Sequence, residues 1–124
     1  MSKLSNLEFF KLVAGNVDAG SAESRFIYPA AIARTLGFNL LEVAPGTATM
    51  EIVADTDKHA NPMGTIHGGV LCDIADAAIG TAYATTLSED ESFASIDLQH
   101  QLFSPGMEWP NPCHRQTGKF GTKD

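Results

Sequence analysis

The sequence contains too few cysteines for a disulfide framework. Only Cys72 and Cys113 occur among 124 residues, and they form no C-x-x-C pair. No apolar run approaches the roughly 20 residues of a membrane span. The N-terminal residues, 1–5, lack the apolar core of a signal peptide. These absences predict reduced thiols in a cytoplasmic protein that has no membrane partner.

Basic residues are also scarce, with 8 Lys and Arg against 15 Asp and Glu, so the formal net charge is −7. This balance argues against nucleic acid and anionic membranes as partners, because phosphate binding needs a basic face. A small anionic ligand remains compatible with it, held by a local basic or backbone site. The histidines at 59, 100 and 114 show no metal-ligand spacing, which predicts no metal site. The sequence also has no G-x-S-x-G elbow, Walker loop or dinucleotide fingerprint.

A chain of this length supports one domain, and its patterns predict a small α+β unit. A capping box, with Ser5 as N-cap and Glu8 three residues later, starts a helix that ends at Gly15. The patterns then predict a short helical turn at 29–35, strands at 38–43 and 47–54 joined by a Pro-Gly turn, a long helix at 67–86 and a third strand at 93–103. We expect an antiparallel sheet wrapped around the long helix. Residues 1–35 would form an N-terminal helical segment, 36–105 the main domain, and 106–124 a tail without a period of 2 or 3.6.

The long helix at 67–86 carries apolar residues over more than half of its circumference, which predicts a largely buried helix. Asp76 interrupts this apolar surface. A buried aspartate loses hydration and needs compensation, so Asp76 is a candidate functional residue. The alternative is a position facing solvent near the helix middle, for which Asp73, one turn earlier, is the better candidate.

Two glycines, Gly68 and Gly69, stand where this helix begins. The first N–H groups of a helix have no partner within it, and glycines leave them accessible. With the helix dipole behind them, these groups can hold an anion or a developing oxyanion. The alternative is that the glycines only permit a tight turn. His67 could likewise orient a substrate or simply hold the loop by hydrogen bonding.

The spacing of these candidates limits how they can act together. Asp76 follows Gly68 by eight residues, which is about 12 Å along a helix. Groups that act on one carbonyl must lie within about 3–4 Å of the reacting atoms. One straight helix cannot supply both, so a site that uses both predicts two antiparallel copies of the helix and a C2 dimer.

The segment N-P-M-G-T-I-H-G-G-V-L-C-D-I-A-D-A-A, residues 61–78, closely resembles the signature of PaaI-type hotdog acyl-CoA thioesterases. The resemblance continues through residues 94–98 and 103–105 and extends back over 36–53, so it covers roughly residues 36–105. It implies the hotdog fold, an antiparallel sheet wrapped around a central helix. It also implies hydrolysis of aryl or short to medium acyl-CoA thioesters, without a metal or redox cofactor, by a homodimer or a dimer of dimers.

The resemblance further implies a role for each matching residue. Asp76 acts as general base or nucleophile, Gly68 donates its N–H to the thioester carbonyl, and Ser95 assists the aspartate. Asn61 and His67 position the thioester and the catalytic water, while Gly64, Thr65 and Gly69 contact substrate. Two alternatives remain: a non-catalytic acyl-CoA-binding or interaction protein, and a hotdog hydratase, whose Asp/His pair is usually spaced differently.

The chain departs from the family after Pro105. Family members continue with three strands, which residues 106–124 cannot supply, so we expect an incomplete hotdog fold of low stability. Back-translation of residues 105–110, read one base later, forces Trp and Gly and permits a continuation like the family's P-V-x-x-G-x-L-x-A-x-A-R. We therefore hypothesise a one-base frameshift after Pro105. The coding DNA tests this: a stop within a few codons of the adjacent frame, or no alternating apolar residues there, contradicts it.

Overall fold

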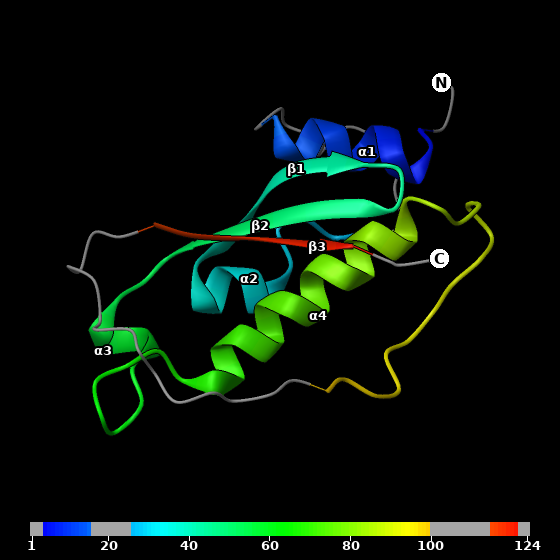
Figure 1. Cartoon of the computed structure of the whole chain (residues 1–124). Coiled ribbons are helices and arrows are strands. Elements are labelled where there is room, and N and C mark those ends of the chain that lie inside the picture. The colour runs from blue at the N-terminus through cyan, green and yellow to red at the C-terminus, as the bar shows by residue number, and fades with distance from the viewer. Residues whose placement is uncertain (1–3, 16–25, 100–114, 122–124) are drawn as a thin grey trace.

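The computed structural model describes residues 4–15, 26–99 and 115–121 of the chain. Its elements are α1 (Asn6–Ala14), α2 (Ala31–Leu36), β1 (Phe38–Ala44), β2 (Thr47–Val53), α3 (Thr56–His59), α4 (Gly68–Ala84) and β3 (Arg115–Gly121). The strands form an antiparallel sheet in the order β1-β2-β3. The long helix α4 crosses one face of this sheet, and α1 lies beside β1 (Figure 1). The predicted α+β class is confirmed.

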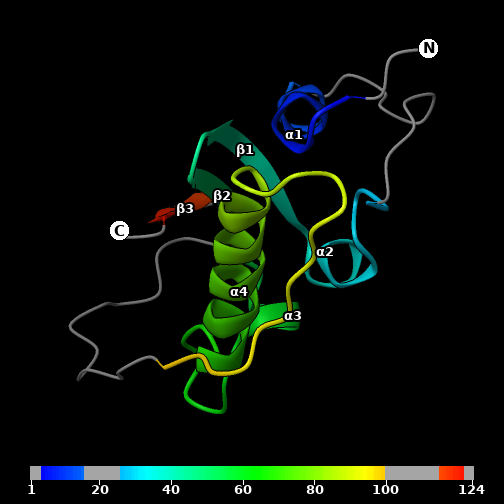
Figure 2. The same cartoon turned by 90° about the vertical axis from the view of Figure 1, so that its right-hand side faces the viewer.

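The core lies between β2 and α4. Met50 and Ile52 on β2 are almost fully buried, as the alternation of this strand predicts. They belong to one cluster with Ile74 and Ala78, whose spacing of four places them on one side of α4. The view along the sheet edge shows α4 stacked directly on the strands (Figure 2). Burial of this face stabilises the contact by the hydrophobic effect.

The hairpin of β1 and β2 forms as the Pro-Gly turn predicts. Gly46 in this turn has φ +72°, a conformation that glycine adopts without steric cost. Its N–H donates to Oγ1 of Thr85 at 2.8 Å, which joins the turn to the end of α4. The pairing shifts by one residue between Leu40 and Glu42, so a bulge bends β1 there.

The N-terminal helix α1 starts with the predicted capping box. Oγ of Ser5 accepts the N–H of Glu8 at 3.2 Å, and a carboxylate oxygen of Glu8 accepts the N–H of Ser5 at 2.8 Å. These bonds from Ser5 hold the pKa of the exposed Glu8 carboxyl below its ordinary value. Phe9 and Phe10 are buried, and their rings pack against those of Phe26 and Tyr28.

One side of α4 is not buried, in contrast to the prediction of a largely buried helix. Leu71, Ile79 and Tyr83 are 44%, 37% and 42% exposed. They stand at multiples of four residues and therefore form one stripe along the helix, with the half-buried Ala75 between them. In the described part of the chain the sheet packs on the side of α4 that carries Ile74, Ala78 and Ala82, about 100° around the helix from the stripe, and this leaves the stripe exposed.

Two further expectations are corrected. Residues 93–99 form no strand, and the rest of the predicted strand, 100–103, lies outside the described residues. Alternation of side chains fits a strand but supplies no hydrogen-bonding neighbour, and 93–99 have none in the described part of the chain. Conversely, we expected no strand after Gly106, yet β3 pairs with the full length of β2, from Thr47↔Gly121 to Val53↔Arg115. Backbone bonds form this pairing, and such bonds leave no periodic signal in side-chain polarity.

The first residue of α1 also secures the end of α4. Nδ2 of the buried Asn6 donates to the carbonyl oxygens of Ala84 and Leu87, at 2.9 and 3.2 Å. The carbonyl of Ala84, the last residue of α4, also accepts the N–H of Leu87 at 3.3 Å, and the carbonyl of Leu87 lies three residues beyond the helix. A side chain 78 positions away in sequence therefore caps the central helix.

We predict that Asn6→Ala lowers the free energy of unfolding by about 2 kcal/mol, because the carbonyls of Ala84 and Leu87 both lose their bond to a buried amide group. Urea denaturation followed by circular dichroism measures this change. The control is Asn39→Ala, at an exposed position of β1 whose side chain makes no hydrogen bond in the described structure. Equal losses in both variants would contradict the capping role.

Candidate active site

The loop that leads into α4 is built around Asn61. Its Oδ1 accepts the N–H groups of Met63 and Thr65 at 3.0 and 3.1 Å, and its Nδ2 donates to Oγ1 of Thr65 at 2.7 Å. Backbone bonds join Asn61 and Thr65 again, and Gly64 turns the chain with φ +78°. Asn61, Gly64 and Thr65 therefore lie together as predicted. In this chain the Asn61 side chain shapes the loop.

His59 fixes the base of this loop, a role that the sequence did not suggest. Its side chain is 2% exposed, with Nδ1 accepting the N–H of Asp55 at 3.0 Å and Nε2 lying 2.7 Å from the carbonyl of Leu36. The ring therefore carries its proton on Nε2 and donates it to Leu36. The carbonyl of His59 accepts the N–H of His67 at 2.7 Å. One buried residue thus joins α3, the end of α2 and the start of α4.

His67 is the N-cap of α4. Its Nδ1 accepts the N–H of Gly69 at 2.9 Å. A Cβ on Gly69 would lie 2.9 Å from that same nitrogen, closer than real Cβ contacts come, so the imidazole needs glycine at this position. Of the two roles considered for His67, holding the loop is the one observed. Because Nδ1 accepts, Nε2 of the neutral ring carries the proton, and the ring is exposed and free to donate it outward.

Of the first three amides of α4, that of Gly68 is the one left without an acceptor in the described structure. Gly69 donates to His67, and Val70 donates to the carbonyl of His67 at 3.0 Å. Within the described residues the N–H of Gly68 has no acceptor, and the 17 residues of α4 extend behind it. An unpartnered N–H at the positive end of a helix dipole attracts an anion or a carbonyl oxygen that gains negative charge.

Asp76 meets Ser95, the residue that the family resemblance pairs with it. Oγ of Ser95 donates to Oδ1 of Asp76 at 2.6 Å, the short distance typical of a hydroxyl bonded to a carboxylate. Both residues are exposed, so the expected loss of hydration at Asp76 is not observed in the single chain. In the single chain Asp76 therefore faces solvent near the middle of the helix, which is the alternative considered for it above. Asp73 is also exposed, and its side chain makes no hydrogen bond in the described structure.

The structure thus assembles two separate groups of candidates. Asn61, Thr65, His67 and the two glycines surround the start of α4, while Asp76 and Ser95 lie near its middle. Because α4 is one uninterrupted helix from Gly68 to Ala84, about 12 Å still separates the Gly68 amide from the level of Asp76. The exposed stripe of Leu71, Ile79 and Tyr83 runs past Asp76 along the same helix.

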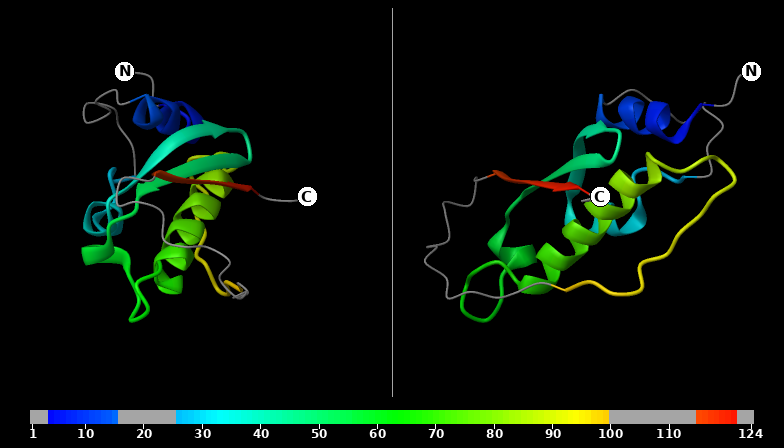
Figure 3. Two further views of the ribbon diagram at one scale, coloured as in Figure 1. Left: turned by 60° about the vertical axis from the view of Figure 1, so that its left-hand side comes forward. Right: turned by 45° about the vertical axis from the view of Figure 1, so that its right-hand side comes forward.

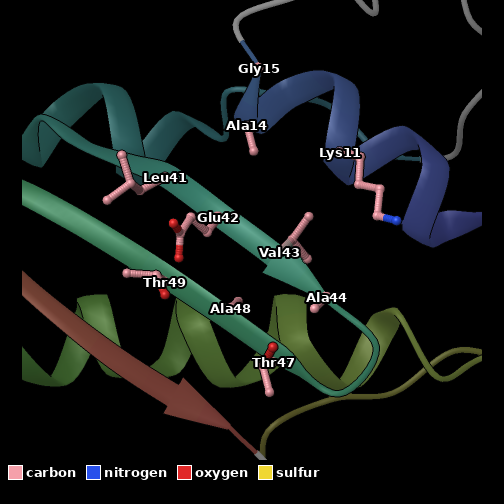
Figure 4. Close-up of a pocket in the computed structure, with 10 residues that line it drawn as sticks. All are labelled: Lys11, Ala14, Gly15, Leu41, Glu42, Val43, Ala44, Thr47, Ala48 and Thr49. Carbon is pink, nitrogen blue, oxygen red and sulfur yellow. The ribbon is translucent and has the colours of Figure 1, made fainter.

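A groove of about 690 Å³ lies elsewhere, between α1 and the hairpin of β1 and β2 (Figure 4). Its lining includes Lys11 on α1, Val43 on β1 and Thr49 on β2. None of the predicted site residues lines this groove. It therefore gives no support to the candidate site, which is defined by the hydrogen bonds around α4.

Among the described residues, no group of three or more His, Cys, Asp or Glu side chains could hold a metal ion. The helices of the described part are all too short or too polar to cross a membrane. Comparison of the chain with protein-family models, with curated proteins and with solved structures found no match. A function for this chain is therefore inferred from its own residues.

Proposed function

We propose that the chain is a hotdog-type acyl-CoA thioesterase that hydrolyses aryl or short to medium acyl thioesters at the interface of a homodimer. The observation that carries the proposal is the 2.6 Å bond between Ser95 and Asp76. The two residues are 19 positions apart and belong to different segments, and family resemblance alone had paired them. The sheet packed on α4 is compatible with part of a hotdog domain.

The chemistry follows from the two groups of residues. With Oδ1 of Asp76 occupied by Ser95, Oδ2 is left to take a proton from water. The resulting hydroxide attacks the thioester carbonyl carbon, and the oxygen that becomes negative accepts the N–H of Gly68 from the other copy. The C–S bond then breaks, and the coenzyme A thiolate takes the proton back from Asp76. Direct attack by the Asp76 carboxylate, followed by hydrolysis of the anhydride, uses the same groups.

The proposed mechanism needs a second copy, and the exposed stripe on α4 supports one. Antiparallel approach of two α4 helices would bring the Gly68 amide of one chain toward Asp76 of the other. It would also cover the exposed stripe of Leu71, Ile79 and Tyr83, which is apolar enough to favour association. Closure of the site would exclude water and strengthen the hydrogen bond from Gly68 to the reacting oxygen.

The alternative is a non-catalytic acyl-CoA-binding protein. The exposure of Asp76 and Ser95 favours it, because a catalytic carboxylate usually acts in a site closed to bulk water. The alternative expects binding of acyl-CoA by a chain that never turns it over.

We predict that Asp76→Asn lowers kcat for hydrolysis of phenylacetyl-CoA and short acyl-CoAs by about 10²–10⁴, because the amide cannot accept the proton of water. Release of the coenzyme A thiol from a panel of aryl, short and medium acyl-CoAs measures the rate. Asp73→Asn is the matched control, one turn away on the same helix, and should retain the wild-type rate. Acyl-CoA binding without hydrolysis by the wild-type chain would instead establish the alternative.

A complementation experiment tests whether the site is shared between chains. Gly68→Pro removes the amide donor at the first position of α4, where proline fits a helix, and His67 already has the extended backbone that precedes proline, with φ −66° and ψ 130°. We predict that Gly68→Pro and Asp76→Asn are each inactive alone. When the two are unfolded together and refolded, half of the dimers should be mixed, each with one intact site, so about a quarter of wild-type activity returns.

Native mass spectrometry confirms that mixed dimers are present in the refolded sample. Mixed dimers without activity would mean that Gly68 and Asp76 do not meet across the interface. Activity in the isolated monomer would mean the same.

A further inference from the structure

Residues 91–99 form a strap, by which we mean a segment without regular secondary structure that runs back along α4 from its C-terminal end (Figures 1 and 2). The further views of the ribbon show the same course (Figure 3). Every residue of the strap is exposed, and Ile96 is 99% exposed. Within the described residues its amides from Ser92 onward have no backbone partners. Side chains must therefore hold the strap where it lies.

The first of these contacts is Phe93 on Gly80. A Cβ on Gly80 would lie 3.4 Å from Cζ of Phe93, so the ring rests directly over the glycine. The ring also meets Tyr83 edge-on, with centroids 5.2 Å apart and an interplanar angle of 87°. A Cβ alone would fit under the ring at this distance, whereas a longer side chain would occupy the place of the ring.

The second contact is the bond from Ser95 to Asp76. The distance between the two contacts is nearly the same along α4 as along the strap. Asp76 lies four residues before Gly80, about 6 Å along the helix axis. Ser95 lies two residues after Phe93, roughly 6.6 Å along an extended chain. Phe93 over Gly80 therefore places Ser95 beside Asp76. A slip of the strap by one residue would bring Ala94 or Ile96 to Asp76 instead.

We infer that Phe93 and Gly80 form a seat that sets the register of the strap, and that Phe93 is a positioning residue for the bond from Ser95 to Asp76. Phe93 needs no contact with substrate for this role. The effect on hydrolysis rests on the proposed function, whereas the register itself does not.

Crosslinking tests the register without any assay of activity. In a background with Cys72→Ser and Cys113→Ser, Asp76→Cys and Ser95→Cys are joined by a short thiol-specific bifunctional reagent. Links within one chain are counted in the monomer band of a denaturing gel. Phe93→Ala should lower the initial crosslinking rate by about tenfold, because the strap loses its ring contact. Ile96→Ala, on the same strap but fully in solvent, should leave the rate within a factor of about two.

Gly80 provides a second variant in case Phe93→Ala affects folding. Gly80→Leu fills the seat from the helix side and should also slow crosslinking. Gly80→Ala adds only the Cβ at 3.4 Å, an ordinary contact distance, and should preserve it. Equal crosslinking rates in Phe93→Ala, Gly80→Leu and Ile96→Ala would overturn the inference.

Kinetics with otherwise wild-type protein then test the consequence. Phe93→Ala should lower kcat by about the same factor as Ser95→Ala with little change in KM, and the double variant should be no worse than Ser95→Ala alone. Phe93→Leu should recover part of the loss, and Ser92→Ala should have no effect. Additive losses would contradict positioning through Ser95. If the wild-type chain hydrolyses no acyl-CoA, the proposed function fails, and the crosslinking rates alone decide the inference.

Discussion

The packing of α4 against β2 determines where the candidate residues on this helix lie. Ala78 and Ala82 are completely buried, and their small side chains let the helix approach the layer formed by Met50 and Ile52. A helix held in this way cannot bend to bring its first residue toward its middle, since tightly packed interiors resist deformation. The amide of Gly68 and the carboxylate of Asp76 are consequently kept apart. If both groups act on one carbonyl, as proposed, the need for a second chain follows from this separation.

Sequence reasoning succeeded where the signal is local. The capping box of Ser5 and Glu8, the hairpin turn at Gly46 and the long helix each depend on residues within a few positions of one another. It failed at residues 93–99 and at β3, because a strand needs a neighbour that only the folded chain provides. Residues 93–99 have alternating side chains but no neighbouring strand, and they form the strap. Residues 115–121 lack that alternation but pair with β2, and they form a strand.

The candidate site also depends on contacts that only the folded chain provides. The meeting of Ser95 and Asp76 was implied by family resemblance and not by spacing, since no period relates residues 19 positions apart. The structural role of His59 could not be predicted from the sequence, because its partners are backbone atoms of Asp55, Leu36 and His67. Main-chain donors and acceptors belong to every residue type. A side chain that binds them is therefore hard to recognise before the fold is known.

The position of β3 also decides on which side the sheet can grow. Among the described strands, β2 is paired on both sides and the outer side of β1 lies near α1 and α2 (Figure 2). The far side of β3 is the other edge, and its backbone groups have no partner strand in the described part of the sheet. An additional strand, from this polypeptide or another, would therefore enter beside residues 115–121. Self-assembly through backbone pairing would be directed by the least apolar strand of the three.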